Sequence, residues 1–268
     1  VSVSTKLPDE VGMSQTGTKN IKELFENIPF SFPKPVSLIK YLISLIAKDG
    51  DIILDFFSGS GTTADATMRV AATNKKNLKY ILVQLQEQCD INSEAYRNGY
   101  KTIDEIGQER IRKAAKKIKE ETNANIDYGF KHYTIKEIDT NTLDKLEKFE
   151  PNYVISDCSI LDEFGIDAVL TTWMNEDGYG LTDTYEKLEL DDYTTYKCQN
   201  TIYLLNSNIS DLFIKALIEK YEKEENFDCN RIVMFGYSFT LNEIQTLKDN
   251  LQQVKNIKGI NVEVITRY

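Results

Sequence analysis

Several kinds of residue are scarce in this 268-residue chain, and each scarcity excludes a class of protein. A single histidine argues against a histidine-ligated metal site, so we predict no metal. The shortest interval between two of the four cysteines, from Cys198 to Cys229, is 31 residues, which excludes a Cys-x-x-Cys redox pair or zinc motif. The thirteen glycines and five prolines are too few for a linker-rich chain. Apolar runs such as residues 52–57 are far shorter than the roughly 18–20 residues of a membrane helix, so we expect a reduced, cytoplasmic protein without membrane contact.

Charge is distributed unevenly along the chain. The formal net charge is −10, from 32 basic and 42 acidic residues. Residues 1–140 hold 20 basic and 19 acidic residues, whereas residues 141–268 hold 12 and 23. Because Lys and Arg make the phosphate contacts of DNA-binding proteins, the acidic second half is a poor candidate for DNA binding. The acidic second half instead favours either solubility or contacts with other proteins.

The first half alternates between helical and strand patterns. Apolar residues at helical spacing predict a helix over residues 35–48. The segments that follow predict a parallel βαβ unit. It consists of a strand over residues 51–57 that is buried on both faces, a glycine turn, a helix over residues 64–72 and a strand over residues 79–85. Residues 128–138 are predicted to add a third strand to this sheet.

An amphipathic helix is predicted over residues 102–121, with isoleucine and alanine facing inward. Its outer face is expected to carry a basic cluster, which consists of Arg110, Arg112, Lys113, Lys116, Lys117 and Lys119. The cluster is either a solvated helix face, which is the commoner arrangement, or a surface that touches a DNA backbone.

The composition shifts at residues 139–141, so we predict a domain boundary near residue 140. A helix over residues 210–221 and strands over residues 231–239 and 260–265 predict that residues 141–268 form a smaller α/β domain.

The most informative segment is Asp55–Thr63, which reads Asp-Phe-Phe-Ser-Gly-Ser-Gly-Thr-Thr. An acidic residue ends a predicted strand, and two glycines permit a tight turn into a helix. The free N–H groups and partial positive charge of a helix N-terminus suit a carboxylate or a phosphate. The segment is not a P-loop, because no lysine follows Gly61. Ala64 stands where a dinucleotide loop has its third glycine, a substitution that the looser form of that pattern allows.

This pattern resembles the cofactor loop of amino-group DNA methyltransferases, which make N6-methyladenine or N4-methylcytosine. The resemblance implies that residues 1–140 are an α/β domain with part of a Rossmann-like methyltransferase sheet, and that the cofactor is S-adenosylmethionine. Phe32-Pro33-Lys34-Pro35 before a helix resembles motif X of the permuted (beta) class, which completes the methionine pocket. The residues implied to bind the cofactor are Lys34, Pro35, Asp55, Phe56, Phe57, Ser58, Gly59, Ser60, Gly61, Thr62, Thr63 and Gln84.

Gln84 is a departure from the family pattern. In the family, the second strand ends in an acidic residue that binds the ribose hydroxyls. Gln84 falls at that place, with Glu87 three residues further on. An amide bonds a hydroxyl less strongly than a carboxylate does.

Further segments narrow the resemblance to the modification (Mod) subunits of type III restriction systems. They extend nearly from end to end of the chain and include residues 17–19, 170–173, 177–182, 214–221 and 235–239. The resemblance implies a site-specific DNA adenine-N6 methyltransferase that forms a homodimer and docks a restriction (Res) subunit.

The catalytic loop of this class, Asp/Asn-Pro-Pro-Tyr/Phe, is not found in the sequence. The nearest segment, Asn27-Ile28-Pro29-Phe30, lacks the first proline and adjoins motif X, so we interpret it as a turn and assign no catalytic residue. The chain begins with Val1 and is expected to be the C-terminal portion of a methyltransferase, inactive alone and without the target-recognition domain. DNA would be bound mainly by the missing N-terminal part.

A second hypothesis makes the chain a non-catalytic assembly module. In this hypothesis residues 141–268 supply a surface for Mod dimerisation or for Res docking. Three tyrosines that look exposed, Tyr193, Tyr196 and Tyr203, would form part of it. The segment Asp177–Gly180 is either a ligand loop or, more commonly for such a sequence, a solvent-facing turn after a helix.

Overall fold

The computed structural model describes residues 7–27, 29–135 and 159–268, which form a mixed α/β protein. The chain divides into two compact units, Val1–His132 and Tyr133–Tyr268, each with its own sheet. The boundary predicted near residue 140 falls outside the described residues. No helix within the described ranges is long and apolar enough to cross a membrane.

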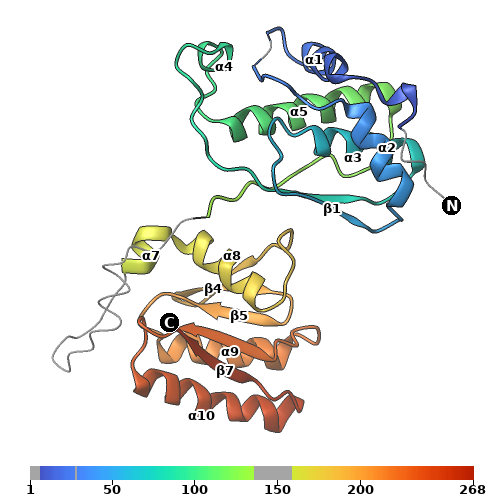
Figure 1. Cartoon of the computed structure of the whole chain (residues 1–268). Helices are drawn as coiled ribbons and strands as arrows, with labels where there is room; N and C mark the ends of the chain where they lie inside the picture. The colour runs from blue at the N-terminus through green and yellow to red at the C-terminus, as the bar shows by residue number, and fades with distance from the viewer. Residues whose placement is uncertain (1–6, 28, 136–158) are drawn as a thin grey trace. The chain divides into compact units, whose positions relative to one another are not determined.

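Unit 1 is built on two parallel strands, β1 (Ile52–Asp55) and β2 (Lys79–Leu82), which helix α3 (Thr62–Asn74) connects. This is the βαβ unit that the sequence predicts. Helices α2 (Val36–Ile46) and α5 (Ile103–Thr122) pack against α3, and the three helices lie on one side of the strands (Figure 1). The other helices described in unit 1 are the 3-10 helix η1 (Asp9–Val11), α1 (Ser14–Lys22) and α4 (Glu94–Arg97).

The two faces of this small sheet differ. Ile53 packs with apolar side chains of α2 and α3, and Leu82 packs with those of α3 and α5. On the opposite face Ile52 is 57% exposed and Leu54 is 51% exposed. The prediction that residues 51–57 form a strand buried on both faces is therefore wrong, because the described helices of unit 1 cover one face alone.

The third strand predicted over residues 128–138 is not formed between residues 128 and 135, and residues 136–138 lie outside the described part of the chain. Tyr128 and Phe130 pack instead against the buried side chains of α3 and α5. The hydroxyl of Tyr128 donates to the carbonyl of Ala124 (2.9 Å). The alternating pattern that suggested a strand thus comes from rings that cover a helix pair.

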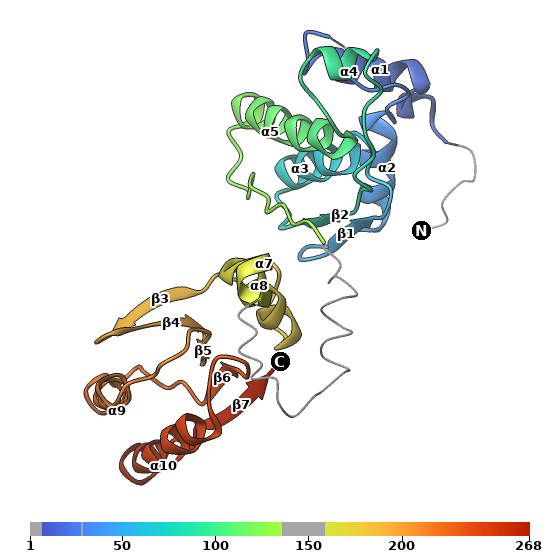
Figure 2. The same cartoon turned by 90° about the vertical axis from the view of Figure 1, so that its left-hand side faces the viewer.

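Unit 2 contains a five-stranded sheet whose spatial order is also the chain order (Figures 1 and 2). The strands are β3 (Glu186–Leu190), β4 (Tyr193–Cys198), β5 (Thr201–Leu204), β6 (Arg231–Phe235) and β7 (Glu263–Arg267). The first three are antiparallel neighbours, and β5, β6 and β7 are parallel. The helices of this unit are α7 (Ser159–Phe164), α8 (Ile166–Glu176), α9 (Asp211–Lys223) and α10 (Leu241–Lys258).

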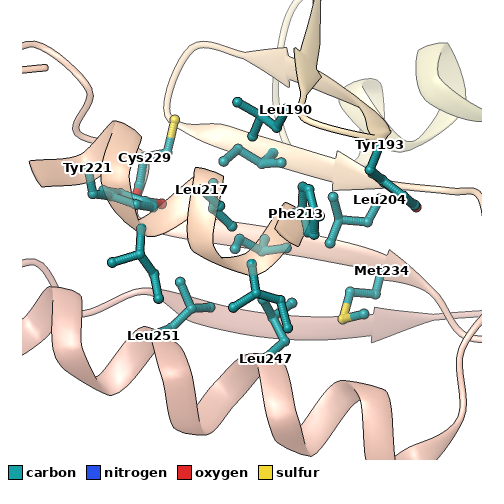
Figure 3. Close-up of a cluster of buried hydrophobic side chains, with 14 of the residues drawn as sticks. Leu190, Tyr193, Leu204, Phe213, Leu217, Tyr221, Cys229, Met234, Leu247 and Leu251 are labelled. Atoms are coloured by element: carbon teal, nitrogen blue, oxygen red, sulfur yellow. The ribbon is translucent and has the colours of Figure 1, made fainter. Parts of the chain in front are cut away.

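The larger core of unit 2 lies between the sheet and the crossover helices α9 and α10 (Figure 3). Phe213, Leu217 and Tyr221 are fully buried along one face of α9, as their four-residue spacing predicts. Leu247 and Leu251 of α10 lie in the same core. A second core, on the other face of the sheet, is formed with Leu170 and Trp173 of α8. Both faces of this sheet are therefore covered by helices.

The three tyrosines expected to be exposed are buried, so that prediction is wrong. Tyr193 and Tyr196 of β4 and Tyr203 of β5 are at most 7% exposed. Two of their hydroxyls are hydrogen-bonded: Tyr193 donates to the carbonyl of Asn206, and Tyr203 donates to the carboxylate of Asp177. These rings belong to strands inside the sheet, where both faces are covered.

Asp177 closes α8 as its C-cap, so the predicted turn after a helix is confirmed. The side chain of Asp177, however, does not face solvent. It pairs with Nη2 of Arg267 on β7 (2.7 Å) and accepts the Tyr203 hydroxyl bond (2.7 Å). The residue therefore ties α8 to the sheet.

Candidate functional site

The glycine loop lies between the end of β1 and the start of α3, and its shape depends on two glycines. Gly59 has φ +49° and Gly61, the residue before α3, has φ +76°. Both values are in the left-handed region, where glycine carries no steric penalty. The loop is thus placed at the carboxyl end of a parallel strand, as the sequence predicts.

Asp55 ends β1 and uses both carboxylate oxygens within the loop. Oδ1 accepts a hydrogen bond from the N–H of Phe57 (3.0 Å), and Oδ2 accepts one from the hydroxyl of Thr63 (2.5 Å). The two contacts join the beginning of the loop to the first turn of α3. Asp55 is half-buried, so its carboxylate remains accessible from one side.

Gln84 also contacts the loop. Its Oε1 accepts a hydrogen bond from the N–H of Gly59 (2.7 Å), and its Nε2 donates to the carbonyl of Leu85 (3.2 Å). The N–H of Ser58 donates to the carbonyl of Val83 (3.1 Å). The segment after β2 therefore supports the glycine loop. The ribose contact expected of Gln84 stays a prediction.

The aromatic residues of the loop differ from its small polar residues in exposure. Phe56 and Phe57 are exposed, whereas Ser60, Thr62 and Thr63 are buried. The loop therefore offers rings to solvent on one side and anchors its hydroxyls in the protein on the other.

Phe30, two residues before the motif X segment Phe32–Pro35, lies against the glycine loop. A Cβ at Gly59 would lie 3.2 Å from the ring of Phe30. Pro35 is buried and precedes the first residue of α2, and Lys34 is exposed. The structure thus brings the chain before α2 into contact with the loop.

Arg110 of α5 does not lie where the sequence predicted. It was expected on the outer, basic face, but it is 0% exposed. Nη1 donates to the hydroxyls of Ser60 (2.9 Å) and Thr62 (2.7 Å), and Nη2 contacts Oδ2 of Asp65 (3.4 Å). Burial lowers the pKa of this guanidinium, and the neighbouring carboxylate of Asp65 opposes the change.

The sequence contains a signal that would have placed Arg110 inside. Ile106, Arg110, Ala114 and Ile118 recur at intervals of four residues, and all four are buried. Position 110 thus belongs to the inward stripe of α5. The other basic residues of this face are solvated or ion-paired, as with Arg112 and Lys113, which both pair with Glu109. Lys117 pairs with Glu23 and Glu121.

The described residues contain no group of three or more side chains that could hold a metal ion. Three cysteines, Cys89, Cys198 and Cys229, are free thiols, and Cys158 lies outside the described residues.

Comparison with known proteins identifies the class of this chain. Residues 10–116 match the sequence model of a DNA methylase family, N6_N4_Mtase, and this match includes the whole glycine loop. Residues 164–260 match the type III R-M EcoP15I C-terminal domain.

Individual relatives identify the branch of that class. The chain is 33% identical over 255 residues to the Mod subunit of the type III restriction-modification enzyme EcoP15I of Escherichia coli (94% of this chain, 38% of the relative). It is 33% identical over 258 residues to the EcoPI Mod subunit of Escherichia phage P1 (95% and 39%). It is 32% identical, over an alignment of 294 positions, to the StyLTI Mod subunit of Salmonella typhimurium (99% and 44%). The chain therefore belongs to the family of type III restriction-modification Mod subunits, and it spans about two fifths of the length of these relatives.

Proposed function

We propose that residues 1–140 bind S-adenosylmethionine and serve as the cofactor part of a type III DNA adenine-N6 methyltransferase. The observation that carries this proposal is the arrangement of Asp55, Gln84 and the Gly59–Thr63 loop at the carboxyl ends of two parallel strands. Ligands of open α/β sheets bind at this edge. The same residues lie in the segment that matches the DNA methylase family. Adenine as the target rests on the resemblance to type III Mod subunits.

The loop has the chemistry that a zwitterionic amino acid requires. Gly61, the residue before α3, has no side chain, so no N-cap side chain accepts a hydrogen bond from the N–H groups in the first turn of α3. These donors and the positive helix end favour the carboxylate of the methionine part. The carboxylate of Asp55 favours the ammonium group, directly or through a water molecule. Phe56, Phe57 and the Lys34–Pro35 segment would line the pocket.

When bound, S-adenosylmethionine would supply a sulfonium methyl group for transfer to the amine of a flipped base, with S-adenosylhomocysteine as the leaving group and a proton lost from the amine. The residues of this chain contribute by orientation. Asp55 and the loop N–H groups hold the two charged ends of the methionine part, and thereby limit the positions open to the methyl group. No residue of this chain is assigned a catalytic role, because the sequence contains no Pro-Pro loop.

We also propose that β1 and β2 are part of a larger, Rossmann-like sheet. Parallel sheets are normally covered on both faces. Here an apolar row remains open on one face, consisting of Ile52, Leu54, Phe56, Ile81, Val83 and Leu85. In this proposal other parts of the methyltransferase extend the sheet at its edges and pack on the open face.

The proposed partners are DNA and a Res subunit, and the DNA would be bound mainly by the N-terminal part of the methyltransferase. The proposed assembled state is a homodimer, and the proposed location is the cytoplasm. They rest on the relatives, which are subunits of restriction-modification enzymes. The assembly-module hypothesis for residues 141–268 is not favoured, because the three tyrosines on which it depended are buried.

Calorimetric titration of the 268-residue chain with S-adenosylmethionine tests the proposal. Asp55→Asn keeps the side-chain shape but removes the negative charge beside the ammonium. We expect the affinity to fall by at least about tenfold, since a hydrogen bond between charged groups is worth roughly 1.5–3 kcal/mol.

The matched control is Asp51→Asn, which changes the same side chain just before β1, at its opposite end. Asp51 accepts a hydrogen bond from the N–H of Lys48 and is exposed. The affinity of this variant should equal that of the wild type. Equal affinities of the Asp55 and Asp51 variants, or a folded wild-type chain that does not bind the cofactor, would contradict the proposal.

A further inference from the structure

The buried guanidinium of Arg110 holds both sides of the left-handed glycine in the loop. One nitrogen, Nη1, donates to Ser60 on one side of Gly61 and to Thr62 on the other. Ser60 and Thr62 are themselves only 2% and 6% exposed. The backbone between these two hydroxyls is therefore fixed at both ends by a single rigid donor.

The backbone of α5 approaches the same loop one turn before Arg110. A Cβ at Gly61 would lie 3.1 Å from the carbonyl oxygen of Gly107, and a Cβ at Gly107 would lie 3.2 Å from the carbonyl oxygen of Gly59. Neither position leaves room for a side chain without a shift. This close approach brings Arg110 within hydrogen-bond distance of the loop hydroxyls.

Asp65 is not the only group that pairs with the buried Arg110. Asp65 already has a closer partner in Arg69, whose Nε lies 2.8 Å from Oδ1, whereas the contact with Arg110 is 3.4 Å. Nε of Arg110 has no hydrogen-bond partner among the described residues. Because a buried cation needs several polar partners, the two short bonds to the loop hydroxyls supplement the ion pair with Asp65.

We propose that Arg110 is a positioning residue: it fixes Ser60 and Thr62 so that the N–H groups of Ser60, Thr62 and Thr63 are held in place for the carboxylate of the methionine part. This inference rests on the proposed function. It adds that cofactor affinity depends on a residue that lies outside the glycine loop in the sequence and acts through it. Arg110 itself is fully buried behind the loop hydroxyls.

The first experiment needs no ligand. Arg110→Lys keeps the charge but loses the planar fork, so it cannot hold two hydroxyls and a carboxylate together. Hydrogen–deuterium exchange of the 268-residue chain should show amides of residues 59–63 exchanging about tenfold faster or more, because the hydroxyl bonds open locally. The matched control is Arg112→Lys on the same helix, whose side chain is 57% exposed. This control should leave exchange in the loop unchanged, and unchanged exchange in a folded Arg110→Lys chain would overturn the inference.

The second experiment compares two ligands. Arg110→Lys should weaken binding of S-adenosylmethionine by about tenfold or more, and should leave binding of 5′-methylthioadenosine, which lacks the amino acid, within about twofold of wild type. Equal weakening of both ligands would mean a general loss of structure and would overturn the inference. A wild-type chain that binds neither ligand would contradict the proposed function alone, and the exchange result would then decide on Arg110.

A third variant covers the case in which Arg110→Lys does not fold. Thr62→Val removes the acceptor of the shorter bond while keeping the shape of the side chain, and should reproduce the faster loop exchange. If both variants fold, the effects of Thr62→Val and Arg110→Lys should be non-additive, because they remove one shared interaction. Fully additive effects, or normal loop exchange in Thr62→Val, would overturn the inference.

Discussion

At the scale of the residue, the contact between α1 and the chain before α2 depends on Gly17 having no side chain. A Cβ at this position would lie 1.9 Å from the carbonyl oxygen of Pro33. One turn later, the side chain of Asn20 accepts a hydrogen bond from the N–H of Val36 at the start of α2 (3.1 Å). These two contacts fix the segment that continues from Phe30, the residue that touches the glycine loop.

We predict that Gly17→Ala destabilises unit 1 by about 1–3 kcal/mol or more, because Pro33 must move. The helical preference of alanine offsets about 1 kcal/mol of this. Urea unfolding followed by circular dichroism measures the change. The fluorescence of Trp173, the single tryptophan, reports separately on unit 2 and should be unaffected.

Gly180→Ala is the control for this substitution. A Cβ there would meet its nearest neighbour, Asp183, at 3.9 Å, an ordinary contact distance. Its effect should stay within about 0.5 kcal/mol. Wild-type stability in Gly17→Ala would show that α1 can move without loss.

The chemistry of the candidate site could be predicted from the sequence where it is local. Asp55, two glycines and two threonines follow one another in nine residues, and the structure places them at the end of β1, in the loop and in the first turn of α3. The contact of Gln84 with Gly59 and the burial of Arg110 could not be predicted in the same way. Both depend on how β2 and α5 pack against that loop, across 25 and about 50 residues of chain.

At the scale of the element, β1 shows which features of a strand an apolar run can predict. The run of apolar residues correctly predicted a strand parallel to β2, but not which face is covered. Leu54 and Ile81 lie opposite each other in register on the open face, whereas Ile53 packs against the helices. Neighbouring positions of one strand therefore have different energetic roles.

We predict that replacing Leu54 and Ile81 together by threonine lowers binding of the dye ANS to the chain and changes stability by no more than about 0.5 kcal/mol per site. Threonine keeps the strand preference and removes apolar surface. Ile53→Thr, the adjacent control, should destabilise by about 1–3 kcal/mol, because it places a hydroxyl in the core. A double variant as unstable as Ile53→Thr would mean that the open face is packed in solution.

The strands β3, β4 and β5 were not predicted, although β5 (Thr-Ile-Tyr-Leu) is apolar and fully buried; for β3 and β4 the sequence explains why. β3 reads Glu-Lys-Leu-Glu-Leu and β4 reads Tyr-Thr-Thr-Tyr-Lys-Cys, so neither contains an apolar run. Their burial comes from cross-strand pairing and from helices that lie far away in the sequence. The parallel strand β6 has the apolar run expected of a doubly covered strand, whereas β7, at the sheet edge, was predicted from alternation; the sequence predicted both with shifted ends.

At the scale of the whole molecule, the two units bury different kinds of ionisable group. Unit 1 buries the Arg110–Asp65 pair, and unit 2 buries thiols and phenols. Burial raises the pKa of the Cys229 thiol to about 11, from an ordinary value near 9. Burial also raises the pKa of Tyr221, whose hydroxyl donates to the carbonyl of Cys229 (2.6 Å). Unit 2 should therefore respond to alkaline pH.

We predict that unit 2 loses stability as the pH rises from 9 to 11. The folded thiol of Cys229 stays neutral in this window while the unfolded one ionises, so its contribution is complete below pH 9 and is lost as the pH rises through about 11. The expected slope is about 1.4 kcal/mol per pH unit from this group. Denaturant titrations followed by Trp173 fluorescence at several pH values measure it.

Cys229→Ala removes this titration and should make the pH profile shallower, although the small cavity lowers stability at every pH. Cys89→Ala, in unit 1, is the control and should leave the Trp173 profile unchanged. An unaltered slope in Cys229→Ala would assign the alkaline response to the tyrosines instead.

The sheet order of unit 2 also has a consequence for the route by which this part of the chain folds. Each strand from β4 to β7 pairs with the strand that precedes it in the sequence. No strand pairing has to wait for a segment from a distant part of the chain, so loop-closure entropy stays small at every step. On the ribosome, each strand can join the growing sheet soon after it emerges, and helices α9 and α10 can cover it in turn.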